Sequence, residues 1–298
     1  MAQRNNGRDA PFTDLLAESE AWLGEAAAII EIIDRDDLPQ RLVESIGRAV
    51  PVELAGVFLY RGRSRPLCLY DNFDSSPDPR AKAGIGNYVD STYVLNPFYL
   101  AHRKGVLRDA VYRMRDLAPD AYFRSGSDKA DKVTFTASEE IGFITDGWPR
   151  GLEEAIIAVP LEAGVTGELC LFISVQHGGF TDAHLADLDR LRPLIASALR
   201  KFWLLRKQQI AALPPDSRMD DAFEAFGRPA LSLREREVVQ LVLRGHSSES
   251  IGYHLGISVT TVKTHRKRAY AKLGISSQSE LFMLFLEAAR SEWTALGP

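Results

Sequence analysis

The chain has 298 residues, of which 45% are hydrophobic and 26% are charged, and its formal net charge is −4. This balance is typical of a water-soluble protein that is long enough for two domains with separate cores. The polar N-terminus lacks the apolar run of a signal peptide, and apolar stretches such as residues 155–161 are too short to span a bilayer, which predicts a cytoplasmic protein without a membrane partner.

The first two thirds of the chain mix helical and strand patterns. Apolar residues recur at helical spacing over residues 12–33, and a second helix is expected after Pro39. Residues 54–60 with 67–70, and residues 155–161 with 168–175, are two strand pairs around short turns. Helices before, between and after antiparallel strands predict an α+β fold, an α/β/α sandwich over residues 12–210.

Aromatic side chains are dense between Tyr93 and Arg124. With a few acidic groups they could line a largely apolar pocket for a small molecule, and an acidic group among aromatic rings would suit an amine. The alternative is a core that simply needs aromatic residues. The candidate ligand-binding residues are Asp90, Tyr93, Phe98, Tyr99, Tyr112 and Trp148.

A long helix is expected from Thr181 to about Gln209, because Thr181 and Asp182 are good helix starters. Its apolar residues recur at alternating steps of three and four, which is a heptad seam that can pair with a second copy. The alternative is a helix packed on its own sheet. The candidate dimerisation residues are Leu188, Leu191, Ile195, Phe202 and Leu205.

Residues 211–229 are predicted to be a linker between two domains. Tandem prolines at Pro214 and Pro215 cannot donate backbone hydrogen bonds, and polar residues and glycine follow them. A short helix around residues 222–226 is compatible with this pattern.

The remaining residues, 230–298, predict four short helices. Ser232 and Glu235 fit a capping box, and Gly245 ends the first helix. The second helix runs from Ser247 or Ser248 to a stop at Gly256. Ser258 caps a third helix that ends at Gly274, and the fourth starts near Ser277.

The third helix has the two faces that a DNA-reading helix needs. Residues 258–274 carry five Lys or Arg residues and no Asp or Glu, which favours contact with a phosphate backbone. A tight turn after the second helix lets the third enter a major groove. The candidate DNA-binding residues on its outer face are Thr260, Thr261, Lys263, Thr264, His265, Lys267 and Arg268.

Enzyme chemistry has no support in the sequence. No nucleophile elbow, phosphate loop or metal-ligand cluster is present, so we expect no catalytic residue, cofactor or metal. His246, His254 and His265 do not place three ligands on one face.

Residues 231–285 resemble the LuxR-type (LuxR/FixJ, GerE-like) helix-turn-helix domain, through the run LSLREREVVQLVLRGHSSESIGYHLGISVTTVKTHRKRAYAKLGI. The resemblance implies an all-α four-helix domain that binds two-fold operators in double-stranded DNA as a homodimer, and more commonly an activator acting on RNA polymerase. It implies that Lys263, Thr264 and Lys267 face base edges or nearby phosphates. It also implies that Thr261, His265 and Arg268 hold the backbone.

The order of elements in residues 12–210 is similar to that of GAF/PAS-like domains, with residues 180–185 as the start of the last helix. This likeness implies control by a small-molecule effector. Asn96 stands where lactone sensors of the LuxR family carry an aspartate, which argues for a different ligand. A sensor domain that binds another protein is the alternative.

Overall fold

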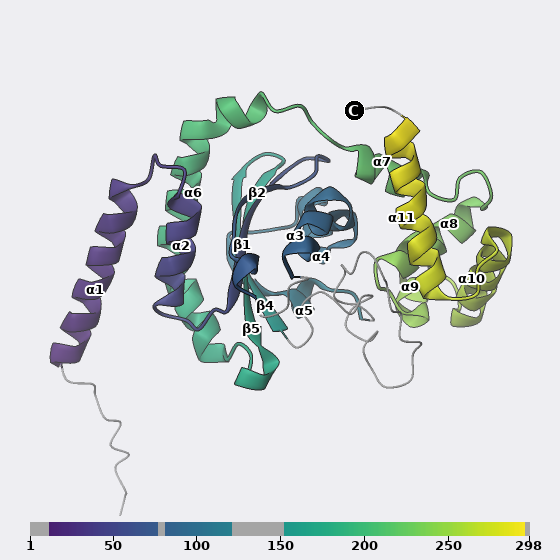
Figure 1. Cartoon of the computed structure of the whole chain (residues 1–298). Coiled ribbons are helices and arrows are strands. Elements are labelled where there is room, and N and C mark those ends of the chain that lie inside the picture. Colours follow the sequence, from purple (N-terminus) through teal and green to yellow (C-terminus); the bar gives the residue numbers. More distant parts are fainter. Residues whose placement is uncertain (1–11, 77–80, 121–151, 296–298) are drawn as a thin grey trace, which may run out of the picture.

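The structure, a computed structural model, describes residues 12–76, 81–120 and 152–295 (Figure 1). Its first part is α+β, as the patterns predicted. Its elements are α1 (Phe12–Glu31), α2 (Leu38–Gly47), β1 (Leu54–Arg61), β2 (Leu67–Asp71), α3 (Ala81–Asp90), the 3-10 turn η2 (Thr92–Leu95), α4 (Pro97–Arg103), β3 (Ala110–Arg113), α5 (Met114–Leu117), β4 (Leu152–Glu162), β5 (Val165–Ser174) and α6 (Asp182–Ala211).

The five strands form one sheet in the order β2-β1-β5-β4-β3, and every neighbouring pair is antiparallel. Both predicted strand pairs are confirmed, while the edge strand β3 was not predicted. Because side chains alternate along a strand, Ile156 and Cys170 lie on one face and Ile157 and Leu169 on the other. The sheet is therefore buried on both sides.

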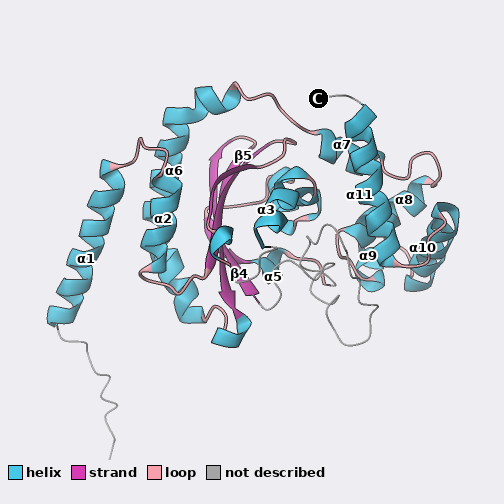
Figure 2. Cartoon of the chain, viewed as in Figure 1, coloured by secondary structure: helices cyan, strands magenta, loops and turns pink. Residues whose placement is uncertain are grey.

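One face of the sheet packs against α2 and α6, with α1 on the outside of this helical layer (Figures 1 and 2). The heptad seam of α6 is used in this packing. Leu188, Leu191, Ile195 and Phe202 are between 0% and 7% exposed, which corrects their expected role as a dimer seam. An apolar stripe at steps of three and four serves a sheet as well as a second helix. Leu205, at 47% exposed, stays on the surface.

The opposite face of the sheet packs against α3, η2 and α4 (Figure 2). Aromatic rings dominate this layer, which we call the aromatic face. Tyr60 from β1 lies 5.4 Å from Phe98 and 6.2 Å from Tyr99, measured between ring centroids. Tyr93 meets Tyr99 edge to face at 4.9 Å.

The C-terminal part is helical, as predicted. Its elements are α7 (Arg218–Ala225), α8 (Leu233–Leu243), α9 (Ser248–Leu255), α10 (Val259–Leu273) and α11 (Gln278–Ala295). The capping box at the start of α8 is confirmed, since the Glu235 amide donates to Ser232 Oγ (3.3 Å) and the Ser232 amide donates to Glu235 Oε2 (2.8 Å). Gly256 and Gly274 end α9 and α10 at φ values of 64° and 71°, which favour glycine.

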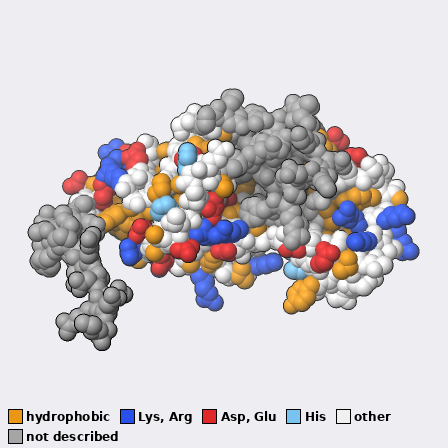
Figure 3. Space-filling view, turned by 90° about the horizontal axis from the view of Figure 1, so that it is seen from below, with side chains coloured by type: hydrophobic (Ala, Val, Ile, Leu, Met, Phe, Trp, Pro, Cys, Tyr) orange, Lys and Arg blue, Asp and Glu red, His pale blue; other side chains and the backbone are white. Residues whose placement is uncertain are grey.

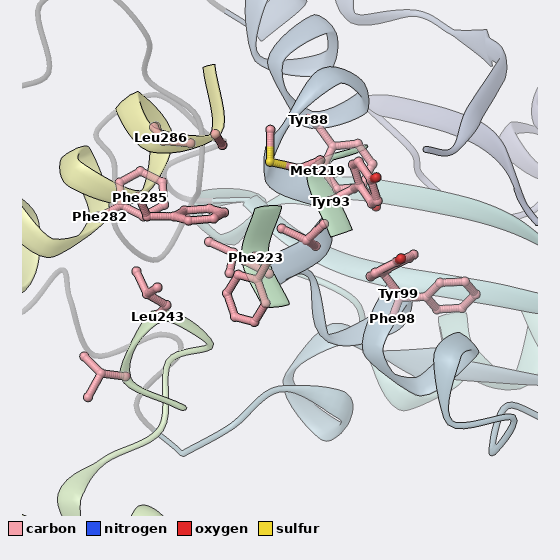
Figure 4. Packing of buried hydrophobic residues seen from close by; sticks show 14 of the residues in the cluster. Tyr88, Tyr93, Phe98, Tyr99, Met219, Phe223, Leu243, Phe282, Phe285 and Leu286 are labelled. Carbon is pink, nitrogen blue, oxygen red and sulfur yellow. The ribbon is translucent and has the colours of Figure 1, made fainter. Parts of the chain in front are cut away.

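The segment between the two parts is more ordered than the proline-rich pattern predicted. Helix α7 spans eight residues, and Phe223 and Phe226 both meet Phe285 of α11 edge to face, at 5.4 and 5.5 Å. Figure 4 shows Phe223 between Phe282 and Phe285 of α11 and the tyrosines Tyr93 and Tyr99 of the aromatic face. One hydrophobic cluster therefore runs from the sheet through α7 into the C-terminal helices.

Over residues 12–76, 81–120 and 152–295, no helix combines the length and apolar character that crossing a membrane requires.

Candidate nucleic-acid interface and aromatic face

The tight turn between α9 and α10 fixes the position of α10. Ser258 caps α10 by accepting a hydrogen bond from the Thr261 amide at 3.1 Å. Val262 and Ala269 are fully buried against α8 and α9, and Tyr270 is nearly so. These contacts anchor one side of α10 and turn the other side to solvent.

The outer side of α10 carries the predicted DNA-binding residues. Thr260, Lys263, Thr264, Lys267 and Arg268 are exposed, and Thr261 and His265 are partly exposed. Lys and Arg side chains gather at the end of the molecule formed by this domain (Figure 3). Since residues 258–274 contain no acid, this surface presents uncompensated positive charge.

A hollow of about 520 Å³ adjoins this surface, between the start of α9 and the outer side of α10. Ser248 of α9 lines it together with Lys263 and Lys267. Arg266 also lines it, with its guanidinium 5.5 Å from the centre of the Tyr270 ring. No acidic side chain lines the hollow, so it suits an anion such as a phosphate group.

One cation of the basic run has a structural role. Lys272 Nζ donates to Glu235 Oε2 at 2.6 Å, so the capping glutamate of α8 also ties α8 to α10. The Lys272 ammonium, with the Ser232 amide, lowers the pKa of Glu235 to about 2. Lys272 therefore helps to hold α10 against α8.

Gly252 of α9 lies where the turn passes closest to the helix. A Cβ added at this position would lie 2.8 Å from the Ile257 carbonyl oxygen. The Ile257 amide donates to the Gly252 carbonyl at 3.0 Å. The glycine, which costs a helix roughly 1 kcal/mol relative to alanine, thus permits this close approach of the turn.

The aromatic face contains a series of buried polar side chains that are hydrogen-bonded to one another. The Tyr60 hydroxyl donates to Glu168 Oε2 (2.6 Å) and is hydrogen-bonded to the Tyr88 hydroxyl. Glu168 is 2% exposed, and burial raises its pKa to about 8. Burial also raises the pKa of Tyr60 well above its ordinary value. The carboxyl group is therefore mostly protonated at neutral pH.

Four of the six predicted ligand residues belong to this one hydrophobic cluster: Tyr93, Phe98, Tyr99 and, partly buried, Tyr112. Asp90 does not join them. It is exposed at the end of α3, where it accepts a hydrogen bond from Arg65 at 3.0 Å. A short helix places that carboxylate on its outer side, where solvation is less costly than burial. Trp148 lies outside the described residues.

Asp220 of α7 was not singled out by the sequence. It is 7% exposed and accepts hydrogen bonds from the Tyr99 hydroxyl (2.9 Å), Arg63 Nε (2.6 Å) and Arg103. Arg244, the C-cap residue of α8, has its guanidinium 4.7 Å from the centre of the Phe223 ring of α7. Asp220 thus links α4 of the aromatic face to α7, the helix that precedes α8–α11.

Tyr60, Glu168 and Asp220 share a weak sequence signal. Tyr60 and Glu168 lie in mostly apolar strands and Asp220 lies on a short helix, and only the pairing of β1 with β5, and the packing of α4 beside α7, brings their partners together. Within the described residues, no group of three or more His, Cys, Asp or Glu is placed to hold a metal ion.

Residues 229–285 match the family model of bacterial regulatory proteins of the luxR family. An HTH-type transcriptional regulator in the exeN 3′ region of Aeromonas salmonicida is 35% identical over 147 residues, which cover 47% of this chain and 74% of that protein. The regulatory protein NarL of Mycobacterium tuberculosis is 45% identical over 51 residues, which cover 17% of this chain and 24% of NarL.

Among solved structures, the VqsR LBD domain of Pseudomonas aeruginosa matches with a TM-score of 0.44 and 20% identity, over 62% of this chain and 98% of that one. SdiA of Escherichia coli matches with a TM-score of 0.36 and 14% identity, over 90% of this chain and 98% of that one. The family match and the Aeromonas relative together show that the chain belongs to the LuxR family of bacterial regulatory proteins and is a transcriptional regulator.

Proposed function

We propose that the chain is a homodimeric, small-molecule-controlled regulator that binds two-fold operators in double-stranded DNA from the cytoplasm and activates transcription by RNA polymerase. Residues 12–210 form the sensor domain, residues 211–229 the connection, and residues 230–298 the DNA-binding domain. One observation supports the DNA-binding role above all. Val262 and Ala269 bury the inner side of α10, so its outer side, which contains no acidic residue, faces solvent.

On this surface, Lys263, Thr264 and Lys267 face base edges or nearby phosphates. Thr261, His265 and Arg268 contact the backbone, and Thr260 completes the surface at the start of the helix.

The effector site lies on the aromatic face of the sheet. Its support is a pair of buried hydroxyl groups, Thr92 Oγ1 and Tyr93 Oη, that have no hydrogen-bond partner among the described residues. Tyr93 is 0% exposed, and leaving such a group unpaired costs free energy that a bound ligand would recover. The rings of Phe98 and Tyr99 would enclose an apolar ligand body, and the hydroxyls would hold one or two polar groups.

A dimer needs an apolar surface that the single chain leaves open. Leu204 and Leu205 on α6, and Leu23 and Ile30 on α1, are all exposed. Arg206 donates to Asp36 Oδ1 at 3.0 Å, which places the end of the α1 region beside this part of α6. We propose that a second copy covers this outer helical surface.

A thermal-shift screen of the full chain against a defined metabolite library tests the effector proposal. A specific ligand must raise the melting temperature, because it binds the folded state. Tyr93→Phe should reduce that rise, whereas Tyr253→Phe, on the exposed surface of α9, should leave it unchanged. A library without any stabilising compound, together with a stable protein complex of the sensor domain, would favour a protein partner instead.

A further inference from the structure

The start of α9 is held by a residue from the sensor domain. The Ser247 amide donates to Asp120 Oδ1 at 3.0 Å, and the Ser247 hydroxyl donates to Asp120 Oδ2. Asp120 follows α5 and is 127 residues away in the chain. The Ser247 oxygen also caps α9 by accepting a hydrogen bond from the Ser250 amide at 3.1 Å.

This geometry is that of an anion bound at a helix N-terminus. An amide and a hydroxyl converge on two oxygens of one carboxylate, at the positive end of the α9 dipole. A phosphate group presents the same pair of oxygens to the same donors. In a helix-turn-helix domain, the first helix crosses the DNA backbone while the second enters the major groove.

The hollow beside α9 provides an independent indication of where a phosphate would go. Its lining includes Ser248, the residue next to Ser247, together with Lys263, Arg266 and Lys267. A backbone that follows these cations reaches the start of α9, where Asp120 now lies. The carboxylate and a DNA phosphate would therefore compete for one position, and their like charges would repel each other.

We propose that Asp120 makes an autoinhibitory contact: its carboxylate occupies a DNA-phosphate position at the start of α9, so duplex binding requires that Asp120 leave Ser247. The sensor domain thereby opposes DNA binding through a single exposed residue, while the outer side of α10 remains open to solvent. A movement of α5 away from α9 removes the opposition.

The test compares full-length proteins that differ by one charge. Asp120→Asn removes the carboxylate, Asp120→Glu retains it, and Asp116→Asn removes a charge from the exposed surface of nearby α5. Binding to a fluorescent random-sequence duplex is measured by anisotropy at several salt concentrations, because phosphate contacts dominate such binding.

We expect Asp120→Asn to bind the duplex roughly threefold to tenfold more tightly than the wild type, as the loss of a charged competitor implies. Its salt dependence should stay close to that of the wild type, because both proteins make the same phosphate contacts once Asp120 has left Ser247. Asp116→Asn and Asp120→Glu should change the affinity by less than about twofold. Equal gains for Asp120→Asn and Asp116→Asn, or no gain for either, would overturn the inference.

A second experiment follows the contact itself. Asp116→Cys on α5 and Glu249→Cys on α9, both at exposed positions that leave the Asp120–Ser247 contact intact, are combined with Cys68→Ser, and a flexible bis-alkylating reagent joins the two thiols. Duplex DNA should lower the cross-linking yield, and an unchanged yield would overturn the inference. If neither wild type nor Asp120→Asn binds duplex at any salt concentration, the DNA-binding role fails as well, which distinguishes the two failures.

Discussion

The Tyr99 hydroxyl donates a 2.9 Å hydrogen bond to Asp220, a buried carboxylate of the helix that joins the two parts of the chain. Tyr99 packs against Tyr60 and Tyr93 on the aromatic face of the sheet. Three residues along α7 from Asp220, the Phe223 ring packs on Phe285 of the DNA-binding domain. Direct contacts through α7 thus join the aromatic rings to the DNA-binding helices.

Replacing Asp220 should loosen this connection. Asp220→Asn leaves Arg63 and Arg103 with a neutral partner, and we expect a loss of about 1–3 kcal/mol of unfolding free energy, discounted because both arginines are partly exposed. Chemical denaturation measures the loss, and limited proteolysis should show faster cleavage between residues 211 and 229. Asp221→Asn, exposed on the same helix, is the control and should cost less than about 0.5 kcal/mol.

The cationic side of α10 should contribute phosphate contacts. Lys263→Ala and Lys267→Ala should each weaken duplex binding and lower the slope of log affinity against log salt by about 1. Fluorescence anisotropy across a salt series measures both quantities. Lys201→Ala removes an exposed lysine from α6 and should change neither. Unchanged affinity and slope in both α10 variants would show that this side does not face DNA.

The Glu235–Lys272 pair should make the DNA-binding domain sensitive to acid. The folded-state pKa of Glu235 lies at about 2, below its ordinary 4.5, so the pair stabilises the fold fully above pH 4.5. That contribution is lost as the pH falls from 4.5 to 2. Glu235→Gln should lower the melting temperature at pH 7 and flatten its decline below pH 4.5. Glu237→Gln, whose partner is Arg234, should retain the wild-type decline.

Glu168 should have the opposite pH dependence. Its folded-state pKa of about 8 exceeds 4.5, so the folded protein binds the proton more tightly and loses stability as the pH rises from 4.5 to 8. Glu168→Gln keeps an acceptor for the Tyr60 hydroxyl without a titrating group. We expect this variant to gain on the wild type by up to roughly 1.4 kcal/mol per pH unit across that window. Denaturation at pH 5 and pH 8 tests this, with the exposed Glu162→Gln as the matched control.

Two substitutions on α6 separate folding from dimerisation. Ile195→Ala empties a buried position against the sheet and should cost about 2–4 kcal/mol of unfolding free energy. Leu205→Ser alters an exposed position and should leave the stability of the single chain nearly unchanged, while weakening the dimer. Light scattering during size-exclusion chromatography gives the oligomeric state. A dimer that survives Leu205→Ser combined with Leu204→Ser would place the contact elsewhere.

The sequence by itself determined the local structure of this protein and the side of α10 that faces outward. The caps at Ser232 and Ser258, and the stops at Gly256 and Gly274, act over three or four residues, so they can be read from the chain directly. The strand-like runs 155–161 and 168–175, joined by a short turn, likewise depend on near neighbours, and they predicted the antiparallel pairing of β4 with β5.

Only the tertiary structure decided how these elements share their surfaces. A stripe of apolar residues at heptad spacing fits a sheet or a second helix equally well. In this chain the stripe packs against the five-stranded sheet, through Leu188, Leu191, Ile195 and Phe202. The pairs Tyr99–Asp220, Tyr60–Glu168 and Asp120–Ser247 join residues more than 100 positions apart. Their contacts depend on the packing of whole elements, which periodicity and capping signals do not encode.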